Sequence, residues 1–128
     1  MISNQTESFE GCPVRLTLHI LGGKWKLLIL SFLLEEKKRY GQLRRSIPEI
    51  SEKVLIHELR KLEENGLVER QVYHQVPPVV EYSLSGYGQS VKPVLESLLR
   101  WGENHAVRAK DAAAPLPLTK VTFHPVSV

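Results

Sequence analysis

The clearest pattern in the chain lies between residues 50 and 70, ISEKVLIHELRKLEENGLVER. Leu55, Leu59 and Leu62 recur there at the i, i+4, i+7 spacing of one helix face. The opposite face of the same helix carries side chains that donate hydrogen bonds, namely Lys53, His57 and Arg60. The segment therefore predicts a helix with one side packed on a core and the other side open to a partner.

The ends of this helix are marked by residues with strong positional preferences. Ser51 is a good N-cap, and Gly66 suits the position just past the last turn. Two β-rich runs follow, at 67–75 and 79–84, on either side of Pro77-Pro78. Proline is compatible with a hairpin tip but not with a central strand position, so these runs predict a β-hairpin.

The earlier part of the chain predicts three further helices. Cys12-Pro13 opens a helix that runs to about Leu21, where Gly22-Gly23 breaks it. The run KWKLLILSFLL is apolar on nearly all sides, so we expect it to form the central buried helix. A short extended segment at 37–40 leads into a short helix at 41–46.

The last predicted helix begins near Ser85 and runs to about Ala109, with Pro93 either kinking it or marking its effective start. In order, these elements predict a mainly α fold with a small β-hairpin, a winged helix-turn-helix. We expect a flexible arm at 1–11, one DNA-binding and dimerisation domain at 12–110, and an Ala/Pro-rich tail at 111–128. A length of 128 residues is consistent with that single domain.

Charge is placed unevenly along the chain, although the formal net charge is only +3. The stretch KKRYGQLRR, residues 37–45, carries Lys and Arg and no acidic residue. A basic segment beside the residue 50–70 helix favours a polyanionic partner. The alternative is a solvated helix face, which is the commoner meaning of a charge cluster.

The cysteine content and the lengths of the apolar runs predict the compartment of the protein and whether it contacts a membrane. One cysteine cannot form an internal disulfide, which favours a reducing compartment. The first residues contain no apolar signal-peptide core, and the longest apolar run, Leu27 to Leu34, is too short to span a bilayer. We therefore expect a cytoplasmic protein without membrane contact.

Three stretches resemble the HxlR-type winged-helix transcriptional regulators: CPVRLTLHILGGKWKLLIL, RYGQLRRSIPEISEKVLIHELRKLEENGLVER and VPPVVEYSLSGYG. Together they cover Cys12 to Trp101. The resemblance implies a cytoplasmic homodimer that binds DNA and controls nearby genes. It also implies, for some members, a response to oxidants or electrophiles through a cysteine at the position of Cys12. Ile56, His19 and Glu49 depart from the family's usual residues, and Ile56 and Glu49 put the base preference in doubt.

We predict that Lys53, His57 and Arg60 read bases in the major groove of a palindromic double-stranded operator. Phosphate contacts are predicted for Arg39, Tyr40 and Arg44, although a core tyrosine is an equal alternative for Tyr40. Ser51 can cap its helix, contact phosphate, or do both. His74, near the wing tip, is a candidate for the DNA backbone or minor groove, and a solvated hairpin residue is the alternative.

Cys12 is predicted at the start of a helix, where backbone N–H groups favour a thiolate that oxidants and electrophiles attack. The alternative is a cysteine packed as a small apolar residue. A homodimer is expected because the first and last helices have more apolar surface than one small core covers.

An enzyme is not expected. GGKWK lacks the Ser or Thr of a phosphate-binding loop, and the histidines show no metal-ligand spacing, so we predict no cofactor and no metal. Two other functions stay open: a winged-helix module for protein contacts without DNA, and a regulator triggered by a small molecule at the dimer interface.

Overall fold

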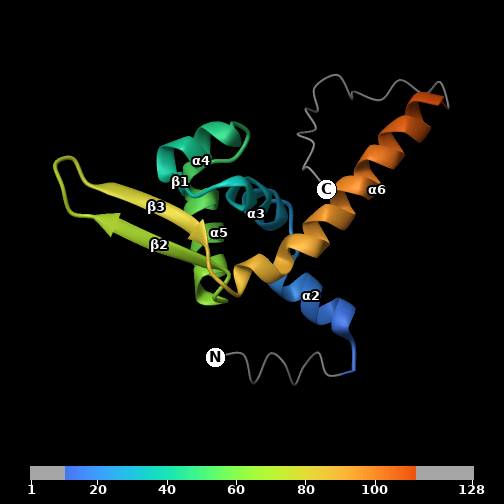
Figure 1. The fold of residues 1–128 in the computed structure, drawn as a ribbon, viewed down its shortest axis with the longest axis horizontal. Helices are drawn as coiled ribbons and strands as arrows, with labels where there is room; N and C mark the ends of the chain where they lie inside the picture. Colours follow the sequence, from blue (N-terminus) through green and yellow to red (C-terminus); the bar gives the residue numbers. More distant parts are fainter. Residues whose placement is uncertain (1–10, 112–128) are drawn as a thin grey trace. The chain divides into compact units, whose positions relative to one another are not determined.

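The computed structural model describes residues 11–111. Its elements are α2 (Pro13–Leu21), α3 (Lys26–Glu35), β1 (Lys38–Arg39), α4 (Tyr40–Ser46), α5 (Glu52–Glu64), β2 (Val68–Tyr73), β3 (Val79–Leu84), η1 (Gly88–Val91) and α6 (Lys92–Asp111) (Figure 1). The predicted arm at 1–11 and tail at 111–128 lie, apart from Gly11 and Asp111, outside the described residues. The mainly α fold with a winged helix-turn-helix is confirmed.

The three strands form one antiparallel sheet in the order β1-β3-β2. The predicted hairpin is β2 and β3, whose register places Arg70 opposite Tyr82. The short extended segment predicted before the third helix becomes β1, which pairs with the other side of β3 through Lys38 opposite Tyr82. The sheet therefore fixes the start of α4 to the hairpin.

Within residues 11–111 the contacts divide the chain into two units, with the boundary between Ser90 and Val91. The domain predicted at 12–110 takes in parts of both units and stays a prediction. The first unit holds α2 to β3, and its core is built on two helices. In α3 the residues Ile29, Leu30 and Leu33 are buried, which fits the central helix that its all-round apolar sequence predicts.

Leu55, Leu59 and Leu62 form the leucine face of α5, and each is at most 1% exposed. The prediction that this side of the helix packs on the core is confirmed. A buried ion pair adds to the apolar packing, because Lys26 Nζ of α3 lies 3.2 Å from both carboxylate oxygens of Glu58. With the two side chains only 14% and 10% exposed, this pair joins α3 to α5 inside the unit.

A Schellman motif ends α5 and starts the hairpin. The N–H of Gly66 donates to the Glu63 carbonyl and the N–H of Leu67 donates to the Leu62 carbonyl, both at 3.0 Å. Gly66 has φ +75°, the left-handed conformation that glycine adopts without steric cost. The prediction of Gly66 just past the last turn is confirmed.

The far end of the hairpin returns to the same point. The Ser85 N–H donates to the Leu67 carbonyl at 3.0 Å, and the Ser85 hydroxyl donates to the Gly66 carbonyl at 2.5 Å. The same hydroxyl accepts from the Gly88 N–H at 2.8 Å. The end of α5 and both ends of the hairpin are therefore bonded at one junction, which we call the Gly66–Ser85 junction.

The second helix differs from its prediction at one end. It begins at Lys26 rather than Lys24. Gly23 has φ +94°, so the turn after α2 continues through Trp25 before helical geometry starts. Pro93 is the second residue of α6, so it marks the effective start of that helix, one of the two outcomes predicted for it.

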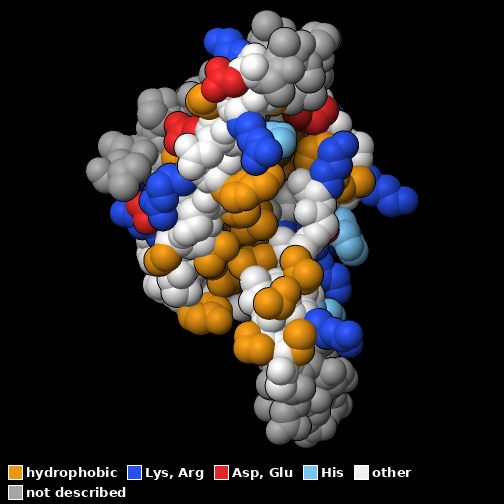
Figure 2. Space-filling view, turned by 90° about the vertical axis from the view of Figure 1, so that its right-hand side faces the viewer, with side chains coloured by type: hydrophobic (Ala, Val, Ile, Leu, Met, Phe, Trp, Pro, Cys, Tyr) orange, Lys and Arg blue, Asp and Glu red, His pale blue; other side chains and the backbone are white. Residues whose placement is uncertain are grey.

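Hydrophobic side chains also reach the surface, as Figure 2 shows for one face. In α2, Val14 is 67% and Leu18 62% exposed. Along α6, in the second unit, the large exposed apolar residues are Val94, Leu98, Trp101 and Val107. Within residues 11–111 no single helix is both long and apolar enough to cross a bilayer, and only α2 and α3 taken together, bent by 74° at their break, reach that length and composition.

Candidate nucleic-acid interface

The helix α5 is positioned by its N-cap and by the turn before it. The Ser51 hydroxyl accepts a hydrogen bond from the Val54 N–H at 3.2 Å, which confirms Ser51 as the cap. In the turn that joins α4 to α5, Ile47 and Ile50 are buried. These contacts set the direction in which α5 leaves the turn, and with it the orientation of its polar side.

Lys53, His57 and Arg60, which we call the outward face of α5, are all exposed. At 100° per residue they lie on the side of the helix away from the leucine face. The His57 side chain is 66% exposed, and its Nε2 lies 4.0 Å from Glu58 Oε2. Further along the same side of the helix lies one acidic residue, Glu64, whose Oε1 is 3.5 Å from Lys61 Nζ.

The arginines predicted to bind phosphate lie around α4. Arg39 is exposed and precedes the helix, and its N–H donates to Gln42 Oε1 at 2.8 Å. Arg44 projects from α4 toward α5, where its Nη1 lies 3.4 Å from Glu52 Oε2. The structure therefore brings Arg44 and the start of α5 together through Glu52.

Tyr40 is half-buried at the start of α4, and its hydroxyl oxygen is buried. Burial first and the nearby Glu52 carboxylate second raise the pKa of this phenol, so it stays protonated and remains a donor. The Glu52 side chain also raises this pKa as a hydrogen-bond partner, although no hydrogen bond to the oxygen meets strict geometry within residues 11–111. A phosphate contact by Tyr40 stays a prediction.

The hairpin extends beyond the sheet to an exposed tip. His74 is exposed just after β2, and Val76 at the tip is 99% exposed. Within the strands that lead to the tip, Glu81 Oε1 of β3 accepts from the Tyr73 hydroxyl of β2 at 3.1 Å and lies 3.5 Å from Lys37 Nζ. This network links the three strand regions.

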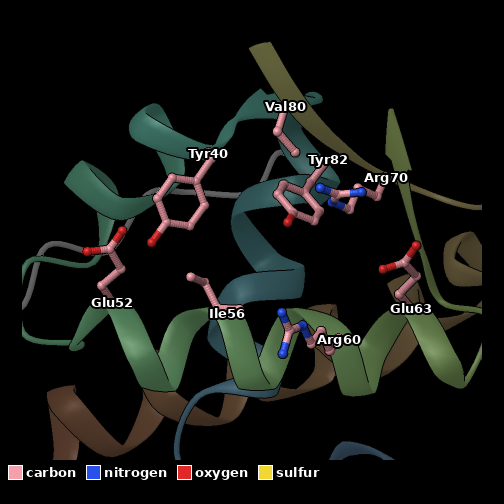
Figure 3. A pocket seen from close by; sticks show the side chains of 8 residues that line it. All are labelled: Tyr40, Glu52, Ile56, Arg60, Glu63, Arg70, Val80 and Tyr82. Atoms are coloured by element: carbon pink, nitrogen blue, oxygen red, sulfur yellow. The ribbon is translucent and has the colours of Figure 1, made fainter. Parts of the chain in front are cut away.

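A hollow of about 430 Å³ lies between α5 and the sheet (Figure 3). Its lining residues are Tyr40, Glu52, Ile56, Arg60, Glu63, Arg70, Val80 and Tyr82. The sequence did not indicate Arg70 and Tyr82 as site residues, because both lie in runs that predict only β-strands. Only their cross-strand pairing, together with the packing of the hairpin against α5, brings them beside Arg60.

Cys12 lies at the N-cap position of α2, as predicted, and is half-buried. Its carbonyl accepts from the Leu16 N–H at 3.2 Å, while its side chain makes no capping hydrogen bond. Residues 11–111 contain no group of three or more His, Cys, Asp or Glu side chains that could hold a metal ion.

Comparison with known proteins gives a consistent family. The family described as HxlR-like helix-turn-helix matches residues 20–110. The HTH-type transcriptional regulator YdeP of Bacillus subtilis strain 168 is 45% identical over 107 residues, which are 84% of each chain.

Solved structures agree with this family. The redox regulator HypR in its oxidized form superposes with a TM-score of 0.70 at 45% identity, covering 73% of this chain and 96% of HypR. The reduced form of the transcriptional regulator YodB from B. subtilis gives a TM-score of 0.64 at 34% identity, covering 72% of this chain and 91% of YodB.

Proposed function

Because this chain belongs to the HxlR-like helix-turn-helix family of transcriptional regulators, we propose that it is a cytoplasmic homodimer that binds operator DNA through α5. The observation that carries the proposal is the outward face of α5. Three hydrogen-bond donors lie exposed there on a helix whose other side is held by a leucine core. A helix presented in this way suits the major groove, where lysine and arginine pair with guanine.

Contacts to the DNA backbone are assigned to the residues that flank α5. Arg39 and Arg44 lie before and within α4, and Ser51 caps α5. Lysine and arginine contacts to phosphate release counterions, so affinity falls steeply with salt. His74 at the end of β2 is the proposed contact from the wing. We assign Tyr40 no base contact, since its hydroxyl oxygen is buried.

The test is selection of bound sequences from a random duplex pool, followed by affinity measurements on the selected site and on random DNA. We expect an imperfect palindrome with half-sites about 34 Å apart or a multiple of that distance. Absence of any DNA binding at low salt would overturn the proposal and favour a module for protein contacts.

Dimerisation is proposed from two exposed apolar surfaces. Val14 and Leu18 of α2 are both more than 60% exposed, and Trp101 of α6 is 69% exposed. Large apolar side chains exposed along one helix are a feature of contact sites in soluble proteins. A two-fold dimer presents a pair of α5 helices to a palindrome.

The dimer is tested by light scattering, where we expect twice the 14.6 kDa mass of one chain. Leu98→Asp should produce the monomer mass, because it places a charge in the exposed apolar stripe of α6 formed by Val94, Leu98 and Trp101. Arg100→Glu is the control, since Arg100 is exposed, lies about 100° or more around the helix from each residue of that stripe, and its substitution also makes the surface of α6 more negative. Equal masses for the two variants would contradict a contact through Leu98.

We also propose that Cys12 is the regulatory input. HypR and YodB, the first named a redox regulator and the second solved also after diamide treatment, support a redox response in relatives of this fold. With one cysteine per chain, oxidation by diamide can join two protomers. Two Cys12 thiols then lose two protons and two electrons, the S–S bond forms, and diamide is reduced to its hydrazine.

The redox proposal is tested with wild type and Cys12→Ser. After diamide, wild type should migrate at the mass of two chains under non-reducing denaturing conditions and lose operator affinity, and dithiothreitol should restore both. Cys12→Ser should change in neither measurement. Equal loss of affinity in both proteins, or none in wild type, would leave Cys12 as a packing residue.

A further inference from the structure

We propose that the hollow between α5 and the sheet is a binding site for a small organic carboxylate with a planar apolar body. A volume of about 430 Å³ falls within the range of small-molecule sites. Figure 3 shows side chains of α5 and of the sheet pointing toward one another across it. All eight lining residues belong to the first unit, so the site needs no second copy of the chain.

Two cationic groups in the hollow are available to an anion. Arg60 comes from α5 and Arg70 from β2, and both line the hollow. Neither forms an ion pair with any residue between 11 and 111. A guanidinium binds a carboxylate through two parallel N–H donors, which makes arginine the residue best suited to this class of ligand.

A third donor lies at the other end of the hollow. The Tyr40 hydroxyl oxygen is buried, which raises the pKa of the phenol, and the Glu52 carboxylate beside it raises that pKa further through its charge and as a hydrogen-bond partner. A carboxylate on a ligand in the hollow would be an alternative acceptor for this hydroxyl. Figure 3 shows the Tyr40 hydroxyl directed toward the Glu52 carboxylate at the start of α5, at the edge of the hollow.

The remaining lining sets the charge and shape of the ligand. Glu52 is paired with Arg44, and Glu63 offsets part of the charge of the two arginines, so a single negative charge is favoured over a phosphate dianion. Ile56, Val80 and the ring of Tyr82 supply apolar walls. The combination suits one carboxylate on an aromatic body of one or two rings.

The position of Arg60 links this site to the proposed function, on which the regulatory part of the inference rests. Arg60 belongs both to the outward face of α5 and to the lining of the hollow. A carboxylate bound to its guanidinium removes that donor from DNA. Ligand and operator should therefore compete, and each should weaken the binding of the other.

The ligand test is made on DNA-free protein, so it is independent of operator binding. The probe is 2-naphthoate, titrated into the full chain and followed by amide and arginine side-chain NMR shifts. We expect saturable shifts at Arg60, Arg70 and neighbours in the hollow. Its neutral isostere 2-naphthamide should bind at least about tenfold more weakly, the loss expected when a charged hydrogen bond is removed.

Variants and a second anion complete the test. Arg70→Gln and Tyr40→Phe should each weaken naphthoate binding while the protein stays folded, and Arg45→Gln should not, because Arg45 is exposed on α4 outside the lining. Inorganic phosphate should bind more weakly than naphthoate. Equal binding of naphthoate and naphthamide, phosphate binding as tight as naphthoate, or no effect of Arg70→Gln would overturn the site.

The competition between naphthoate and operator DNA is measured in a separate experiment. Naphthoate should lower operator affinity in wild type and have a smaller effect in Arg70→Gln. If naphthoate binds the hollow but the protein binds no DNA, the site stands and the proposed function fails. If DNA binds and naphthoate occupies the hollow without lowering its affinity, the site stands and the competition between ligand and operator is wrong.

Discussion

On one side of α5, the leucine face is at most 1% exposed and packs with α3 in the core of the first unit, whereas on the other side the outward face is open to solvent. The same thirteen residues, Glu52–Glu64, carry both. Substitutions on the first side should change the free energy of unfolding, and substitutions on the second should change DNA affinity alone. The comparison therefore separates fold from function within one helix.

The largest expected effect is on the leucine face. Leu59→Ala should lower the free energy of unfolding by about 2–5 kcal/mol, because it removes buried methyl groups and leaves a cavity. Urea denaturation of both proteins measures this change. At temperatures where the variant is still folded, its operator affinity should equal that of wild type. A folded Leu59→Ala protein with impaired DNA binding would contradict the assignment of stability to the leucine face and DNA affinity to the outward face.

The second-largest effect on the free energy of unfolding is expected for the ion pair between Lys26 and Glu58. Lys26→Ala should destabilise the protein by roughly 2–3 kcal/mol, somewhat less than for a fully buried pair, because it leaves the Glu58 carboxylate buried without its partner. The double variant Lys26→Met with Glu58→Leu should recover most of that loss, since neither charge is then left alone. Thermal unfolding of the three proteins would test this. Additive losses in the double variant would mean that the two side chains act independently.

On the outward face, Lys53→Ala should weaken binding to the selected operator by about 1–3 kcal/mol and leave binding to random DNA nearly unchanged. Its free energy of unfolding should stay within about 0.5 kcal/mol of wild type. Lys92→Ala, an exposed lysine at the start of α6, is the matched control. An unchanged preferred sequence and affinity in Lys53→Ala would remove Lys53 from the reading side.

The smallest effect is expected where the two sides meet. Ser51→Ala should destabilise the protein by about 1 kcal/mol, because the Val54 N–H loses its acceptor. Ser51→Asp retains an acceptor and should keep the stability, while its negative charge should lower affinity for all DNA sequences if Ser51 lies beside a phosphate. Denaturation and shift assays on the same two variants distinguish the cap from the phosphate contact.

The sequence predicts this helix well because its signals are local. The leucine spacing, the Ser51 cap and Gly66 lie within a few residues of one another and act through helix geometry alone. The hairpin is also local, with its prolines at the tip. The helix α3 begins two residues later than the sequence predicts, because the backbone at Gly23 takes a left-handed conformation that residue types alone do not specify.

The hollow could not be predicted in the same way. Arg60 and Arg70 are ten residues apart on different elements, and Tyr40 and Tyr82 come from distant parts of the chain. Their convergence depends on the β2–β3 register and on how the hairpin packs on α5. The sequence identified Tyr40 as either a core residue or a phosphate contact, and its half-buried position beside Glu52 lies between the two.

The Gly66–Ser85 junction has a consequence for how this chain tolerates changes in length. One residue inserted between Leu62 and Leu67 would turn the end of α5 by about 100°, and the bonds to Ser85 would carry both ends of the hairpin with it. An insertion beside Val76, which is 99% exposed, alters only the tip. Natural insertions and deletions should therefore gather at the tip of the hairpin and be absent at its base.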